Sequence, residues 1–104
     1  MIQEFSKIEK YALMHILIQI MEADGIVDKR EELFIDKMFN LFQITEKEVS
    51  IIVNFEQYQC ENLIKEMQGE KKEFAKKIFY EIAYCDGILA QSELDIILKI
   101  IGGL

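Results

Sequence analysis

The sequence predicts an all-α fold, a compact bundle of about six helices built from two pseudo-repeated hairpins in which an Asp-Gly turn joins two helices. Apolar residues recur at helical spacing, and no segment shows the sustained alternation of a strand. Proline is absent, so the strongest helix breaker is missing. One phrase occurs at both 24–31 and 86–93: an Asp-Gly pair, two aliphatic residues, and a Glu seven residues after the Asp.

The first helix is predicted to begin near Ser6 and to run to the first Asp-Gly pair. Ser6 and Glu9 have capping-box spacing, in which a hydroxyl and a carboxylate satisfy the first backbone N–H groups of a helix. The middle of this segment is apolar on most sides, and only His15, Gln19 and Glu22 form a narrow polar stripe. Such a helix is expected at the centre of the bundle.

The second helix is predicted to follow the first Asp-Gly pair directly. Gly25 is the expected stop of the preceding helix, because glycine adopts the left-handed conformation that often follows a helix. Asp28 is the expected N-cap, with Glu31 at the third helical position as a second capping box. Leu33 extends a broad apolar face that continues to Phe42.

Two further helices are predicted to connect the hairpins. Thr45 and Glu48 have capping-box spacing and start the third helix, which continues to about Phe55. The fourth is shorter, at about 58–68, and Gly69 is expected to end it.

The second hairpin is predicted from a shift of 62 residues, which places Asp86 on Asp24. The fifth helix covers about 71–84 and stops at Gly87, and the sixth covers about 91–101. At this shift the apolar residues of the first and fifth helices coincide. We therefore expect the two hairpins to pack face to face, with the first and fifth helices in the middle.

Length and charge limit the classes of function and partner that the sequence is compatible with. The chain has 104 residues, which predicts a single domain over 1–104. Its formal net charge is −7, which argues against nucleic acid as a partner and suits cations or basic protein segments. The amino terminus lacks the basic segment of a signal peptide, and the longest apolar run is too short to span a bilayer. A cytoplasmic location is the expectation.

The acidic residues around the two turns have two interpretations. They can cap the adjoining helices, or their oxygens can bind a hard divalent cation such as Ca²⁺ or Mg²⁺. The pattern is not an EF-hand loop, because glycine follows the first Asp directly and aliphatic residues occupy ligand positions. The candidate metal ligands are Asp24, Asp28, Glu31, Asp86 and Glu93, with Glu32 close to the first turn, and Gly25 and Gly87 as the structural turn residues.

The remaining reactive side chains predict no catalytic site. His15 is the sole histidine, which excludes a multi-histidine zinc site and favours a hydrogen-bonded structural role. Cys60 and Cys85 lack a CxxC partner and are expected to be buried thiols. No nucleophile motif or phosphate-binding glycine loop accompanies the carboxylates, so we expect no enzymatic activity.

The two phrases in full, MEADGIVDKREELFIDKM and AYCDGILAQSELDIILKI, resemble the TerB-like (tellurite-resistance TerB) family, which includes the amino-terminal domain of DjlA-type co-chaperones. The resemblance covers nearly the whole chain. It implies an all-α bundle without known catalysis, linked to tellurite and other stress responses, to metal-ion sensing and to membrane-associated assemblies. The acidic positions implied by the motif are Asp24, Glu31, Asp86 and Glu93.

The second phrase departs from the family pattern. Ala90 replaces a small polar cap, and Cys85 replaces the Ala before Asp-Gly. The expected function is that of a non-enzymatic, stress-associated domain, cation-binding or sensing through its acidic turns, that acts through protein interaction. The alternative is a purely structural adaptor of the DjlA type that binds no metal.

Overall fold

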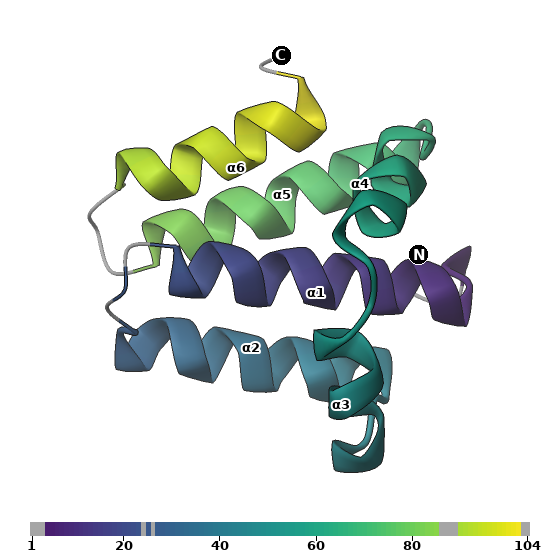
Figure 1. Cartoon of the computed structure of the whole chain (residues 1–104), viewed down its shortest axis with the longest axis horizontal. Helices are drawn as coiled ribbons and strands as arrows, with labels where there is room; N and C mark the ends of the chain where they lie inside the picture. Colours follow the sequence, from purple (N-terminus) through teal and green to yellow (C-terminus); the bar gives the residue numbers. More distant parts are fainter. Residues whose placement is uncertain (1–3, 24, 26, 86–89, 103–104) are drawn as a thin grey trace.

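The computed structural model describes residues 4–23, 25, 27–85 and 90–102, and within these ranges it contains six α-helices and no strand (Figure 1). The all-α prediction is therefore confirmed. The helices are α1 Lys7–Glu22, α2 Lys29–Phe42, α3 Glu46–Val53, α4 Gln57–Lys65, α5 Glu70–Tyr84 and α6 Gln91–Ile101.

Helix α1 lies at the centre and contacts each of the other five helices. In Figure 1, α2, α1, α5 and α6 follow one another across the view, and α3 and α4 lie at the front. The carboxyl ends of α1 and α5 lie at the same end of the bundle as the amino ends of α2 and α6 (Figure 1). Both hairpin junctions are thus at one end of the molecule.

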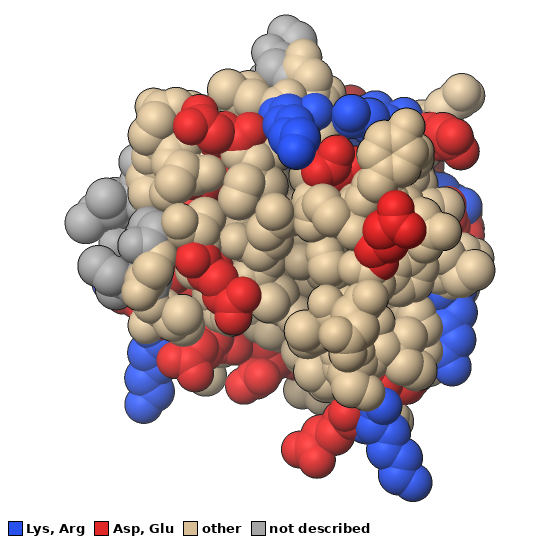
Figure 2. All heavy atoms as spheres, viewed as in Figure 1, with Lys and Arg blue, Asp and Glu red and all other residues tan. Residues whose placement is uncertain are grey.

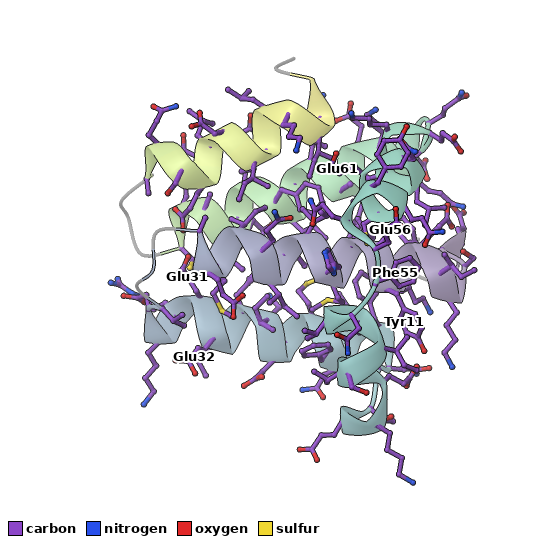
Figure 3. All side chains as sticks on the ribbon, in the orientation of Figure 1. Tyr11, Glu31, Glu32, Phe55, Glu56 and Glu61 are labelled. Carbon is purple, nitrogen blue, oxygen red and sulfur yellow. The ribbon has the colours of Figure 1, made fainter. Side chains whose placement is uncertain are left out.

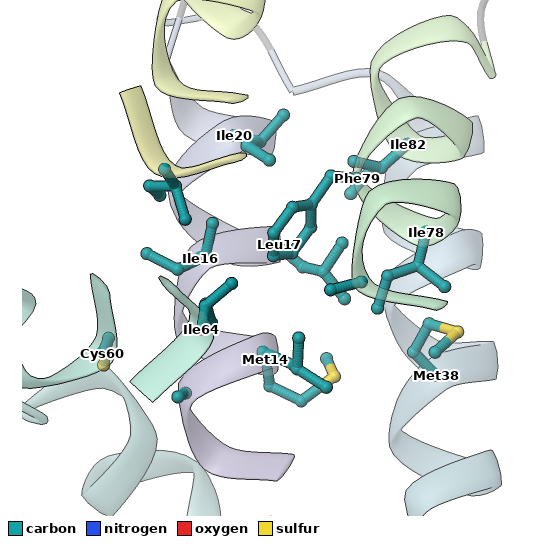
Figure 4. Packing of buried hydrophobic residues seen from close by; sticks show 14 of the residues in the cluster. Met14, Ile16, Leu17, Ile20, Met38, Cys60, Ile64, Ile78, Phe79 and Ile82 are labelled. Carbon is teal, nitrogen blue, oxygen red and sulfur yellow. The ribbon is translucent and has the colours of Figure 1, made fainter. Parts of the chain in front are cut away.

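Helices α1 and α5 supply about half of the buried apolar side chains of the core, and α1 packs most extensively against α4. Leu17 and Ile20 of α1 are completely buried, as are Phe79 and Ile82 of α5 (Figure 4). Full burial of one such side chain contributes about 1.5–3 kcal/mol relative to leaving it in water. Helix α1 is central because apolar side chains cover most of its sides.

The predicted caps of the first helices are present. Ser6 accepts a hydrogen bond from the Glu9 N–H, and the Glu9 carboxylate accepts one from the Ser6 N–H, at 3.1 and 2.8 Å. The Thr45 N–H donates to Glu48 Oε1 at 3.0 Å. Local sequence alone therefore places the starts of α1 and α3.

Two details of the prediction are wrong. Helix α4 ends at Lys65, because the chain tightens to bury Met67, whose N–H donates to the Ile64 carbonyl at 3.1 Å. Gly69 therefore does not end α4; it precedes α5 with φ +59°. Leu33 is 58% exposed, because it lies on the side of α2 opposite the buried Phe42.

Other predictions reach beyond the described residues. Gly87 and the second Asp-Gly turn lie outside them, so the internal repeat stays a prediction. None of the described helices is both long and apolar enough to cross a membrane.

Candidate functional site

The start of α2 holds two of the predicted acidic residues in a cap. Asp28 Oδ1 accepts hydrogen bonds from the backbone N–H and the Nε–H of Arg30, at 2.7 and 3.2 Å. The backbone bond, followed by the side-chain bond, lowers the pKa of Asp28. Glu31 turns back to accept the Asp28 N–H at 3.2 Å and is only 2% exposed. Figure 3 shows Glu31 and Glu32 near this end of α2.

The start of α6 repeats half of this arrangement. Glu93 Oε1 accepts the Ala90 N–H at 3.3 Å, and Glu93 is also 2% exposed. Because Ala90 has no side-chain oxygen, the reciprocal bond made by Asp28 in the first hairpin has no equivalent here. Glu31 and Glu93 are both acidic residues that the protein buries to close the first turn of a helix.

The divalent-cation interpretation depends on residues that the structure does not describe. Asp24 and Asp86 lie outside the described ranges. Within those ranges, no group of three or more His, Cys, Asp or Glu side chains is placed to hold a metal ion. Calcium takes six to eight oxygen ligands, whereas the described turn residues already use oxygens in caps.

His15 is hydrogen-bonded, as expected, and it belongs to a network that joins four helices. Its Nδ1 lies 2.8 Å from the Ile52 carbonyl, and its Nε2 lies 2.9 Å from Gln57 Oε1. The Gln57 amide donates to Glu61 Oε2 at 2.8 Å, and Lys99 Nζ lies 3.2 Å from the same oxygen. The bond from Gln57, with a smaller contribution from Lys99, lowers the pKa of the buried Glu61.

A second network surrounds Glu48. Besides the Thr45 N–H, its carboxylate accepts the hydroxyl proton of Tyr11, and Lys7 Nζ lies 3.3 Å away. The bond from Thr45, followed by that from Tyr11, lowers the pKa of Glu48 to about 2. The sequence identified Glu48 as a cap but missed Tyr11, which is 37 residues away along the chain.

The cysteines differ in their surroundings. Cys60 is completely buried, as predicted, and burial raises the pKa of its thiol to about 12. Cys85 is only partly buried, so the expectation of a buried thiol is wrong for this residue. It is the C-cap residue of α5.

Sequence reasoning also missed a surface that we call the α3–α4 corner. It consists of two hollows, about 340 and 180 Å³, together with Glu56 and Tyr58. The smaller hollow includes Val53 and Gln57, the two ends of the connection between α3 and α4, and the larger includes Phe55 in its middle. The larger is lined by Ile8, Phe55, Gln59, Asn62, Leu63 and Glu66. The smaller is lined by His15, Ile18, Gln19, Glu22, Val53 and Gln57. Only the polar stripe of α1 was visible in the sequence.

A comparison with known families identifies the first half of the chain. The model of the family described as tellurite resistance protein TerB matches residues 1–54, which include α1, the first acidic turn, α2 and α3. No curated protein and no solved structure matches the chain.

Proposed function

Because that match covers just over half of its length, the chain belongs to the TerB family, and we propose that it is a non-enzymatic, stress-associated domain that acts by binding a protein partner. We further propose that the acidic turns bind a divalent cation, Ca²⁺ or Mg²⁺, and so make the domain responsive to the ion. We expect it to work in the cytoplasm and to reach membrane-associated complexes through its partners, without binding nucleic acid.

The uses of the described carboxylates support a non-enzymatic role. Glu9, Glu31, Glu48 and Glu93 each accept the N–H of the residue that caps their own helix. A carboxylate in the first turn of a helix stabilises it by about 0.3–1 kcal/mol. These acidic groups are therefore explained by folding and need no chemical reaction to account for them.

One observation supports the cation proposal most directly: both hairpin junctions lie at the same end of the bundle (Figure 1). The described helices that precede and follow each Asp-Gly pair therefore have those ends at one end of the bundle. Asp28, the N-cap of α2, is a further carboxylate beside the first of these pairs. Asp24 and Asp86 are the residues we expect to supply the remaining charge.

The alternative is that the turns are purely structural. The burial of both Glu31 and Glu93 favours it, since an inward-facing carboxylate that closes a helix cap has less freedom to meet an ion. In this case the domain is an adaptor that binds its partner without any metal.

Thermal unfolding with added Ca²⁺, Mg²⁺ or Mn²⁺ separates the two. A cation at about a hundred times its dissociation constant should stabilise the wild-type protein by about 2.7 kcal/mol. The double variant Asp24→Asn with Asp86→Asn should lose this effect. The matched control is Asp36→Asn, which removes one exposed carboxylate from α2 and should keep it.

Two results of the melting experiment would contradict the cation proposal. If none of the three ions raises the melting temperature at millimolar concentration, the structural alternative replaces the cation proposal. If Asp36→Asn abolishes the response as fully as the double variant, the effect comes from overall charge and not from the turns.

A further inference from the structure

We propose that the α3–α4 corner is the docking surface for the partner, and that the partner presents an amphipathic helix with Lys or Arg beside its apolar face. The inference rests on the proposed protein-binding function and specifies the surface and the chemistry. It involves none of the acidic turn residues.

Several large apolar side chains of the corner are exposed to solvent. Ile8 is 54% exposed and Val53 is 55% exposed, and each lines one of the two hollows. Tyr58, which starts the outer side of α4, is 66% exposed. Exposed apolar side chains that line hollows on a folded protein are candidates for a site of interaction. The apolar face of a helix would cover it.

The charges of the corner select a basic partner. Glu66 and Glu22 are exposed and line the larger and the smaller hollow, and the exposed Glu56 lies on the connection between them (Figure 3). Among the described residues, these three carboxylates make no salt bridge, whereas Glu9, Glu48 and Glu61 pair with Lys71, Lys7 and Lys99, respectively.

The surrounding surface agrees with this selection. In Figure 2, which shows this face, most of the Lys and Arg side chains lie near the edge, and acidic side chains interrupt the uncharged area. A basic segment would meet its opposite charges near the middle of the face. Complementary charges of this kind steer encounter and exclude acidic partners.

The smaller hollow has the size of a side-chain pocket. A site for a drug-sized molecule usually measures about 300–1,000 Å³, so the smaller hollow, about 180 Å³, lies below that range. It is lined by Ile18, Val53 and the exposed Glu22. A Lys or Arg side chain could lay its stem on Ile18 and Val53 and donate to the Glu22 carboxylate. Apolar side chains of the same helix would enter the larger hollow.

The test uses a fluorescent synthetic helix of leucine and lysine, with its leucines on one face, and measures binding by anisotropy in buffer containing EDTA. Wild-type protein should bind it. A peptide with glutamate in place of lysine should not bind, and one with the same residues scrambled to remove the apolar face should bind at least about threefold more weakly.

Two pairs of variants locate the binding. Glu56→Gln with Glu66→Gln should weaken binding about threefold to tenfold, as expected for the loss of two exposed ion pairs. The control Glu32→Gln with Glu81→Gln removes the same charge from exposed positions on α2 and α5 and should change binding by less than about twofold.

The apolar pair is Ile8→Ser and Leu33→Ser, which alter side chains of similar exposure, 54% and 58%. Only Ile8→Ser should weaken binding. All variants should keep the wild-type melting temperature within a few degrees, because each changed side chain is exposed.

The proposal is overturned if wild-type protein does not bind the Leu–Lys helix or if the scrambled peptide binds equally well. It is also overturned if each control variant weakens binding as much as the corner variant with which it is matched. Because EDTA is present and the turns are unchanged, such a result removes this surface only. The cation proposal fails separately, in the melting experiment.

Discussion

At the scale of single residues, some of the described carboxylates hold a helix start, whereas others stay exposed. Glu31 and Glu93 are buried and bond to the backbone of their own N-caps, whereas Glu22, Glu56 and Glu66 are exposed beside the hollows of the α3–α4 corner. The former contribute to folding. The latter give the surface its charge and are the better candidates for contact with another molecule.

Glu48 should give the protein a measurable sensitivity to acid. Its pKa is lowered from the ordinary 4.5 to about 2, so its contribution to stability is fully present above about pH 4.5 and is lost as the pH falls toward 2. Wild-type protein should therefore lose stability more steeply over this range than Glu48→Gln. Urea unfolding midpoints measured across the range test this.

A control isolates Glu48 from the other carboxylates. Glu46→Gln removes an exposed acidic residue from the same first turn of α3 and should keep the wild-type profile. Equal acid sensitivity in wild type and Glu48→Gln would show that the contacts with Thr45 and Tyr11 do not stabilise the ionised form.

Residue roles were predictable where the partner is close in sequence. Glu9 and Ser6, or Glu31 and Asp28, are three residues apart, and a capping box needs no knowledge of the fold. The partners of His15 lie 37 and 42 residues away, and that of Tyr11 lies 37 residues away. These contacts form only after α3 and α4 have packed on α1, so no local sequence pattern predicts them.

At the scale of elements, the end of α2 contains a backbone conformation that its residue does not favour. Gln43 has φ +59°, in the left-handed region that costs a residue with a side chain about 1–2 kcal/mol. Its N–H still bonds to the Asn40 and Phe39 carbonyls, so this conformation closes the helix.

Gln43→Gly should therefore stabilise the protein. Glycine adopts this conformation without strain but has a more flexible unfolded chain, so we expect a net gain of about 0.5–1 kcal/mol. Chemical denaturation of both proteins measures it. The reverse change, Gly25→Ala, should destabilise, because φ at this position is +76°. A loss of stability in Gln43→Gly would contradict this explanation of the turn.

Element starts were more predictable than element ends. Ser6, Asp28 and Thr45 each precede a Glu at the spacing of a capping box, and each caps a helix. Gly69 was assigned to the end of α4 because glycine often stops a helix, but the burial of Met67 ends that helix earlier. Tertiary packing determines where α4 ends, and the local sequence pattern contains no information about that packing.

At the scale of the whole molecule, the sequence predicted the centre better than the surface. The apolar surround of α1 indicated its central position, and α1 contacts every other helix. The α3–α4 corner was not predictable, because its residues are far apart in the sequence: Ile8 lies in α1, Val53 ends α3 and Glu66 follows α4. Leu33 shows the converse, since an apolar residue within an apolar segment remains exposed.

Amide hydrogen exchange of the whole chain, with and without the leucine–lysine helix, tests most directly the claim that this protein acts through the α3–α4 corner. We predict slower exchange in the connection from Val53 to Gln57, in α4 and in the first turns of α1, with no change in α2. Slower exchange confined to α2 and α6, or no change anywhere in the chain, would contradict it.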